Sequence, residues 1–154
     1  MYNSIGLSVM DQHTYRCLWR DMNSSIEPDH YVLTCVTFGD RPAGAIAVIA
    51  LRKTAEMFES KFITAAKIII NDSYVDDIIF SVNDTNLANT LMSDIDYILK
   101  EGGFQIKEWV TTLKGNNDIN SSFPVANSDE NKVLGMLLNT ESDHFKFQFN
   151  LHFF

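Results

Sequence analysis

The fold is decided by the stretch Ile68-Ile69-Ile70-Asn71-Asp72-Ser73-Tyr74-Val75-Asp76-Asp77-Ile78-Ile79-Phe80, in which two isoleucine-rich runs flank a short polar segment. Apolar β-branched runs on either side of a polar break are typical of a β-hairpin. The adjacent carboxylates Asp76 and Asp77 then lie at its turn, where a bound cation relieves their mutual repulsion. Mg²⁺ suits such a site, because it binds through one or two carboxylates together with substrate phosphates. An exposed acidic turn without a ligand is the alternative, because Asp is a common turn residue.

The composition indicates one globular domain without a membrane segment. The chain has 154 residues, of which 45% are hydrophobic and 21% are charged, an ordinary balance for a folded domain. No run approaches the roughly 20 apolar residues of a membrane span, and the start Met1-Tyr2-Asn3-Ser4 lacks the features of a signal peptide. Cys17 and Cys35 have no zinc-ligand spacing, so we expect reduced core thiols in an intracellular protein. We also expect Trp19 and Trp109 to pack in the core.

The charge of the chain limits its partners. The formal net charge of −8 argues against free binding to nucleic acid, which requires a positive surface. Any nucleic-acid function therefore needs lysines and arginines that lie outside this chain.

The N-terminal half is expected to contain two strands and a helix. Residues 15–20 alternate in polarity and residues 31–38 are rich in β-branched and aromatic side chains, so the two segments should pair as antiparallel strands. Pro42 suits the first turn of a helix, and apolar residues then recur at helical spacing, which predicts a helix over 42–59. Residues 64–70 form either a short helix or the first hairpin strand, because periodicity cannot distinguish the two over so few residues.

The C-terminal half is expected to contain a second helix and three strands. Asn83-Asp84-Thr85 supplies a helix cap, and Gly102-Gly103 ends the helix. The expected strands are 104–110, 132–138 and 144–149, with a loop over 111–130. The complete order is strand, strand, helix, acidic hairpin, helix, strand and hairpin. This order predicts an α+β fold, in which an antiparallel sheet carries two main helices on one face.

Five segments of the chain carry a family resemblance. Tyr74-Val75-Asp76-Asp77 matches the Tyr-x-Asp-Asp motif of reverse transcriptases. Phe38-Gly39-Asp40-Arg41-Pro42-Ala43-Gly44-Ala45 resembles the strand-to-helix element that these enzymes place under the template and the incoming nucleotide. Asp11-Gln12-His13-Thr14-Tyr15-Arg16-Cys17-Leu18-Trp19-Arg20 resembles the region after their first catalytic motif. Downstream, Gly102-Gly103-Phe104-Gln105-Ile106-Lys107-Glu108-Trp109 resembles their next motif, and Lys132-Val133-Leu134-Gly135-Met136 resembles the hairpin that grips the primer. In this order and spacing the chain resembles the palm of a Bel/Pao-type retrotransposon polymerase.

The resemblance implies an incomplete palm-like fold within a longer polyprotein. Residues 1–112 would be the palm fragment, and 113–154 would be a loop and β-hairpin leading toward the thumb in the same domain. Family members carry a further aspartate a few residues before the aromatic that matches Tyr2, and this chain begins after that point. Leu138 stands where the family often has tryptophan, and Arg41-Pro42-Ala43-Gly44 matches the family's small-residue pattern only approximately. The expected location is the cytoplasm or a retroelement particle.

The resemblance implies RNA-directed DNA synthesis by nucleotidyl transfer. A primer 3′-hydroxyl would attack the α-phosphate of a deoxynucleoside triphosphate, assisted by two Mg²⁺ ions about 3.5–4 Å apart. By resemblance Asp76 is a direct metal ligand and Asp77 a second, weaker one. The implied partners are an RNA or DNA template with its primer and the nucleotide, and no membrane. This acidic fragment by itself is expected to bind nucleic acid weakly.

The resemblance also assigns roles to residues outside the aspartate pair. Nucleotide binding is expected from Tyr2, Phe38 and Gly39, and primer contact from Tyr74, Val75, Leu134, Gly135 and Met136. Lys107 is the candidate proton donor to pyrophosphate. Structural alternatives are a core aromatic for Tyr2, a turn before a helix for Gly39, hairpin packing for Tyr74 and Val75, and a solvated lysine for Lys107.

Three functions therefore stay open at the level of sequence. The first is an enzyme module, the palm core of a reverse transcriptase, inactive alone because two carboxylates without a third hold a metal pair badly. The second is a non-catalytic relic or an adopted interaction domain that kept the fold. The third is a small Mg²⁺-binding or phosphoesterase domain, in which Asp11, Asp40 or Asp72 would converge on Asp76.

Overall fold

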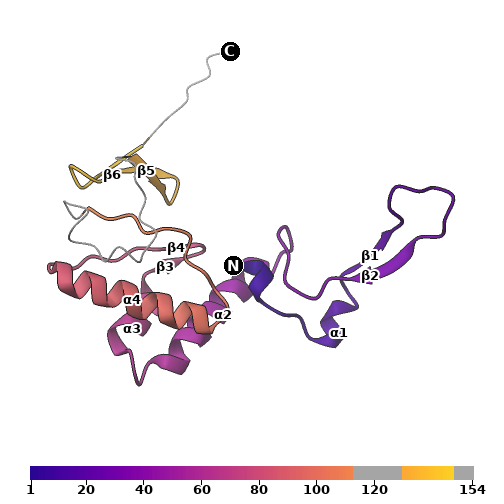
Figure 1. Cartoon of the computed structure of the whole chain (residues 1–154), viewed down its shortest axis with the longest axis horizontal. Helices are drawn as coiled ribbons and strands as arrows, with labels where there is room; N and C mark the ends of the chain where they lie inside the picture. Colours follow the sequence, from indigo (N-terminus) through magenta and orange to yellow (C-terminus); the bar gives the residue numbers. More distant parts are fainter. Residues whose placement is uncertain (113–129, 148–154) are drawn as a thin grey trace, which may run out of the picture.

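A computed structural model describes residues 1–112 and 130–147 of the chain (Figure 1). Its helices are η1 (Tyr2–Ser4), α1 (Val9–Gln12), α2 (Ala43–Phe58), α3 (Ile63–Asn71) and α4 (Thr85–Glu101). Its strands are β1 (Arg16–Trp19), β2 (Asp29–Val32), β3 (Ser73–Tyr74), β4 (Asp77–Ile78), β5 (Glu130–Val133), β6 (Met136–Asn139) and β7 (His144–Lys146). The protein is thus mixed α and β, as the order of elements predicts.

The strands in residues 1–112 and 130–147 form three small antiparallel sheets rather than one. The sheets are β1–β2, β3–β4 and β5–β6–β7, and in each of them a strand pairs only with its neighbours in sequence. The prediction of a single antiparallel sheet covered by two helices is therefore wrong for the described residues. The physical reason is that these strands are only two to four residues long, too short to offer an apolar face that recruits distant strands.

The core is built by α2, α3 and α4. In α2 the buried residues are small or aliphatic and recur every fourth position, namely Ala43, Ala47, Leu51 and Ala55. This spacing puts them on one stripe of the helix, and the alanines let the neighbouring helix approach closely. From α3 and α4, the side chains of Ile69, Ile95 and Ile98 are fully buried in the same cluster. The helical layer is therefore the core on which neighbouring segments pack, through Ile5, Ile78 and Ile106 among others.

Both predicted long helices are confirmed. Pro42 directly precedes α2, which runs over nearly the whole predicted span. At the start of α4 the Asp84 carboxylate accepts a hydrogen bond from the N–H of Leu87 at 3.0 Å, which satisfies one of the free donors of the first turn. The helix ends at Gly102, and Gly103 follows with φ of 76°, a conformation that glycine adopts readily.

The stretch that decides the fold is divided between a helix and a hairpin. Ile68 to Asn71 form the last turn of α3, so the alternative of a short helix over 64–70 is the correct one. Ile68 and Ile69 are buried against the other helices, and this packing outweighs the β preference of an isoleucine run. The hairpin is confirmed, but it is shorter than predicted because β3 starts only at Ser73.

The N-terminal ribbon is paired as predicted but is not part of the core. β1 and β2 are antiparallel, with Cys17 opposite Tyr31, and Figure 1 shows them projecting away from α2, α3 and α4. All eight residues of the two strands are exposed, so neither face of the ribbon is buried. The predicted core positions of Cys17 and Trp19 are therefore wrong. The strand expected to reach residue 38 ends at Val32, although Cys35 still forms a bridge with Gly6.

Two predictions for the C-terminal half are corrected. Between Phe104 and Val110 the structure has no strand of two or more residues, because Phe104 and Trp109 turn inward to the helical core; the core position of Trp109 is confirmed. The strand expected over 132–138 is split into β5 and β6 by a turn at Leu134 and Gly135. The predicted loop 111–130 lies mostly outside the described residues, as does the end of the last predicted strand, 148–149.

Across the described residues, no helix combines the length and the apolar character that a bilayer crossing requires.

A close contact between α4 and α2 gives a test of the helical packing. A Cβ atom at Gly102 would lie 2.5 Å from Thr54 Cγ2 and 2.7 Å from Thr54 Oγ1, and Thr54 is held by the hydrogen bond that its hydroxyl donates to the Ala50 carbonyl at 3.0 Å. We expect Gly102→Ala to lower the free energy of unfolding by about 1–3 kcal/mol, because the helices must separate. Urea denaturation followed by circular dichroism measures this. In a Thr54→Ala background the cost should largely disappear, and an equal cost in both backgrounds would contradict the packing.

Candidate functional site

The hairpin presents its two aspartates differently. Tyr74 pairs with Asp77, so the turn consists of Val75 and Asp76, and Asp77 is the first residue of β4. Asp76 is exposed, whereas Asp77 is half-buried. The prediction that the acids lie at the tip is confirmed for Asp76, and Asp77 is adjacent to it.

Val75 gives this turn a strained backbone. Its φ is 52°, in the left-handed region that β-branched residues rarely adopt. For an L-residue that conformation costs roughly 1–2 kcal/mol. The hairpin keeps the conformation because its base is fixed: the N–H of Ile79 donates to the Asp72 carbonyl at 3.1 Å, directly after α3. Such strain concentrates at functional sites, although it does not by itself identify one.

The hairpin tip is joined to the predicted primer-contact segment. The N–H of Leu134 donates to Asp77 Oδ2 at 3.1 Å, across 57 positions of sequence. Leu134 and Gly135 form the turn between β5 and β6, and Met136 opens β6. Tyr74, with 69% of its surface exposed, and Val75 lie on the same hairpin. The structure therefore brings the candidate primer contacts to the candidate metal ligands, which sequence spacing could not indicate.

The three candidate nucleotide-binding residues also lie together. The rings of Tyr2 and Phe38 are 4.6 Å apart between centroids and inclined at 59°, and Phe38 is 73% exposed. Gly39 follows with φ of 85° and open space where a side chain would lie. In the described parts of the chain, no hydrogen bond or ring contact joins this group to the hairpin of Asp76.

No third metal ligand joins the aspartate pair within residues 1–112 and 130–147. No three Asp, Glu, His or Cys side chains there are close enough to hold one ion. Asp40 instead accepts a hydrogen bond from the Tyr15 hydroxyl. Asp11 lies in the first turn of α1, where its carboxylate accepts a hydrogen bond from the hydroxyl of the capping residue Ser8 at 2.7 Å. The convergence of Asp11, Asp40 or Asp72 on Asp76 that a phosphoesterase-like domain requires is therefore not seen.

The donor set fits a single Mg²⁺ ion. One or two carboxylates, completed by water and substrate phosphates, are the usual protein contribution to a Mg²⁺ site. Asp76 and Asp77 can supply that contribution, and Asp76 does so without breaking any hydrogen bond among the described residues. Two closely spaced ions need additional carboxylates, which the described residues do not place at the hairpin.

The side chain of Lys107, the candidate proton donor, extends into solvent. Its side chain is 91% exposed, and its ammonium lies 3.6 Å from Glu108 Oε1.

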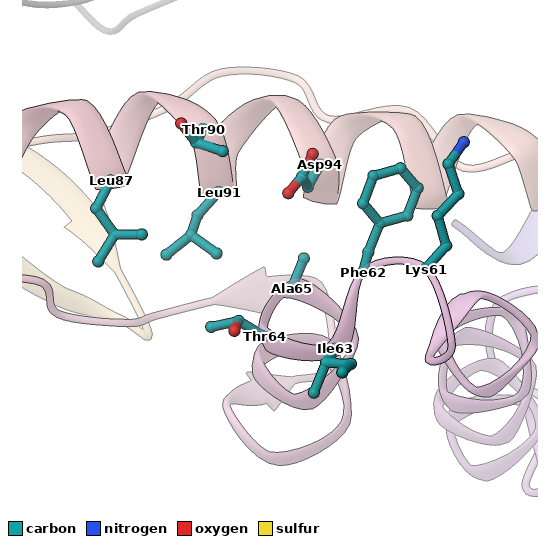
Figure 2. A pocket seen from close by; sticks show the side chains of 9 residues that line it. All are labelled: Lys61, Phe62, Ile63, Thr64, Ala65, Leu87, Thr90, Leu91 and Asp94. Carbon is teal, nitrogen blue, oxygen red and sulfur yellow. The ribbon is translucent and has the colours of Figure 1, made fainter.

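A surface hollow that sequence reasoning did not indicate lies between the start of α3 and α4 (Figure 2). Its volume is about 280 Å³. It is lined by Lys61, Phe62, Ile63, Thr64, Ala65, Leu87, Thr90, Leu91 and Asp94. None of the residues predicted to act in the site lines this hollow, and the Lys61 ammonium is already over the rings of Phe62 and Tyr97, at 4.7 and 4.9 Å from their centroids.

The link between Tyr15 and Asp40 leads to a prediction about pH. The hydrogen bond that the hydroxyl donates to the Asp40 carboxylate raises the pKa of Tyr15, and desolvation and the charges of Asp40 and Asp11 raise this pKa further. The link stabilises the fold below the ordinary tyrosine pKa of about 10 and is lost as the pH rises through the higher folded value. We expect Asp40→Asn to lower the Tyr15 pKa, measured by NMR of ¹³Cζ-labelled tyrosine. Asp29→Asn is the control, and an unchanged Tyr15 pKa in Asp40→Asn would contradict the link.

The strain at Val75 leads to a second prediction. Val75→Gly removes the left-handed penalty, and we expect it to stabilise the hairpin by about 1 kcal/mol, somewhat less than the full penalty because glycine is more flexible when unfolded. Hydrogen exchange of the Ile79 amide, which closes the hairpin, should slow about fivefold. Val75→Ala is the matched control and should give a smaller effect. Faster exchange in Val75→Gly would show that the turn is not strained.

No protein-family model, no curated protein and no solved structure matches this chain.

Proposed function

We propose that this chain is part of the palm of an RNA-directed DNA polymerase from a Bel/Pao-type retroelement. In this proposal the hairpin of Tyr74, Val75, Asp76 and Asp77 is the metal-binding centre for nucleotidyl transfer. The observation that carries it is the hydrogen bond between Asp77 and Leu134. This bond joins the two segments to which the sequence resemblance gives catalysis and primer binding, and the two are distant in sequence.

The setting of the acidic pair supports the proposal. Catalytic carboxylates must be held on rigid elements. Here the hairpin follows α3 directly, and α3 is anchored by the burial of Ile68 and Ile69 in the helical core. Asp76 is exposed to solvent at the tip, where a phosphate-bound ion has access. A buried aspartate or one within a helix would have argued against polymerase chemistry.

The proposed mechanism gives each group a limited task. When bound, Mg²⁺ would supply the positive charge that activates the primer hydroxyl and stabilises the leaving pyrophosphate oxygens. Asp76 would bind the ion through its exposed carboxylate, and Asp77 would join the hairpin tip to Leu134 through its hydrogen bond. The exposed ring of Phe38, packed on Tyr2, would offer an apolar surface to the nucleotide sugar. Gly39, without a Cβ, would let the nucleotide approach the backbone.

Charge and donor count limit what the chain does alone. The net charge of −8 repels a nucleic-acid backbone. The pair of carboxylates suits one ion rather than two. In this proposal, template binding and the second ion depend on parts of the polymerase beyond these 154 residues.

An adopted interaction domain is the second candidate, and one observation favours it. The β1–β2 ribbon exposes Trp19 at 53% and Tyr31 at 48% on one face and Leu18 at 58% on the other. Exposed apolar patches mark surfaces that bind other proteins. In a polymerase the rest of the enzyme would cover this ribbon, whereas in an adopted domain a separate partner would do so.

Ion binding tests the first candidate. Mn²⁺, a paramagnetic substitute for Mg²⁺, should broaden the amide resonances of residues 74–78 in the ¹⁵N-labelled chain. Asp76→Asn should weaken this binding at least about tenfold, because it removes the charged ligand. Asp72→Asn is the matched control, since it removes the same charge four positions away. Equal weakening by both variants would indicate only a diffuse acidic surface, and no broadening of the hairpin at millimolar Mn²⁺ would contradict the site.

Primer extension and the transcript distinguish the two candidates. We expect no extension of a DNA primer on an RNA template by the isolated chain, because the second ion lacks ligands; detectable extension would contradict this. The transcript sequence immediately upstream of the Met1 codon gives the second measurement. An in-frame aspartate codon a few positions before Tyr2 supports the polymerase, and stop codons there support the adopted domain.

A further inference from the structure

The bond between Asp77 and Leu134 stands at the meeting point of two hairpin turns. One turn is formed by Val75 and Asp76 between β3 and β4, and the other by Leu134 and Gly135 between β5 and β6. Leu134 has φ of 51° and Gly135 has φ of 77°. Two successive positive φ values in a two-residue loop are the mark of a type I′ turn.

The N–H of Leu134 needs an acceptor outside its own hairpin. In the β5–β6 ladder the last pair is Val133 with Met136, so the two turn residues lie beyond the ladder. Leucine is also an unusual residue for the left-handed position, where Asn, Asp and Gly are preferred. The Asp77 carboxylate supplies the missing acceptor at 3.1 Å. A hydrogen bond to a charged acceptor is among the stronger kinds.

The neighbouring acid is in a contrasting situation. Asp76 is exposed in the turn and accepts no hydrogen bond from residues in the described part of the chain, whereas Asp77 is half-buried and aims one oxygen at Leu134. The two carboxylates are adjacent in sequence, but among the described residues only that of Asp77 accepts a hydrogen bond from the protein. Their environments therefore indicate separate tasks.

We propose that Asp77 is a positioning residue, which holds the Leu134–Gly135 turn against the hairpin tip, and that ion binding belongs to Asp76. The inference deepens the proposed function, on which the task of Asp76 rests. The positioning of the Leu134 turn by Asp77 does not require an ion. If Asp77 positions this turn, the placement of Leu134, Gly135 and Met136 beside the acidic tip depends on one oxygen, Asp77 Oδ2.

The charge and the hydrogen bond of Asp77 can be separated by substitution in the full chain. Asp77→Asn removes the charge but keeps a carbonyl acceptor in nearly the same shape. Asp77→Ala removes both. Asp76→Asn removes the neighbouring charge and leaves the Leu134 bond in place. Spectra of α2, α3 and α4 in each ¹⁵N-labelled variant verify that the helical core is folded.

The first measurement needs no ion. Hydrogen exchange of the Leu134 amide should accelerate at least about tenfold in Asp77→Ala and change less than about threefold in Asp77→Asn and Asp76→Asn. In the unsubstituted chain, a through-hydrogen-bond coupling between the Leu134 nitrogen and Asp77 Cγ should be detectable, which keeps the test valid if Asp77→Ala does not fold. Unchanged Leu134 exchange in Asp77→Ala, or absence of the coupling with a rapidly exchanging Leu134 amide, would overturn the proposal.

The second measurement uses Mn²⁺ and separates positioning from general stability. Bound Mn²⁺ should broaden the amides of 134–136 as well as those of 74–78. In Asp77→Ala the 134–136 amides should escape broadening while the hairpin amides retain it, and Asp77→Asn should restore both. A loss of Mn²⁺ affinity in Asp77→Asn as large as that in Asp76→Asn would make Asp77 a ligand and overturn the division of tasks. If no variant binds Mn²⁺, the metal site and the task of Asp76 fail, and the exchange data alone decide the role of Asp77.

Discussion

The burial of α3 between α2 and α4 is the constraint on which the rest of the structure depends. Ala65, Ala66 and Ile69 of α3 are fully enclosed by the apolar faces of its neighbours. The hairpin has only two residues in each strand, and a ribbon of that size is not stable by itself in water. It is held because it continues directly from the end of this buried helix. The position of the acidic pair is therefore a consequence of helix packing.

Sequence patterns predicted those parts of the fold whose signals are local. The caps of α4, the proline before α2 and the spacing of apolar residues define two helices within a residue or two. The run of three isoleucines left a short helix and a strand both open. The helix forms because the β preference of the run is weaker than the gain from packing Ile68 and Ile69 in the helical core. Likewise, alternation in β1 suggested a buried face, but burial requires a second layer over the strand pair. Trp19 is 53% exposed, and every residue of β1 and β2 is exposed.

For the candidate site, the sequence indicated which residues matter but not how they meet. The adjacent aspartates were visible as a motif, and Asp76 lies at the tip as expected. The bond to Leu134 spans 57 positions, and no periodicity encodes such a contact. A local signal for the turn did exist, because Leu134 is followed by glycine at a position that requires positive φ. Reading that signal would have split the predicted strand over 132–138 correctly.

The link between Tyr15 and Asp40 has a mechanical consequence. Tyr15 stands at the root of the projecting ribbon, where its carbonyl accepts the N–H of Leu33 at 3.0 Å and its hydroxyl reaches Asp40. Asp40 directly follows Phe38 and Gly39, the corner proposed to receive the nucleotide. The base of the ribbon is thus tied through one side-chain hydrogen bond to the segment that carries Phe38 and Gly39.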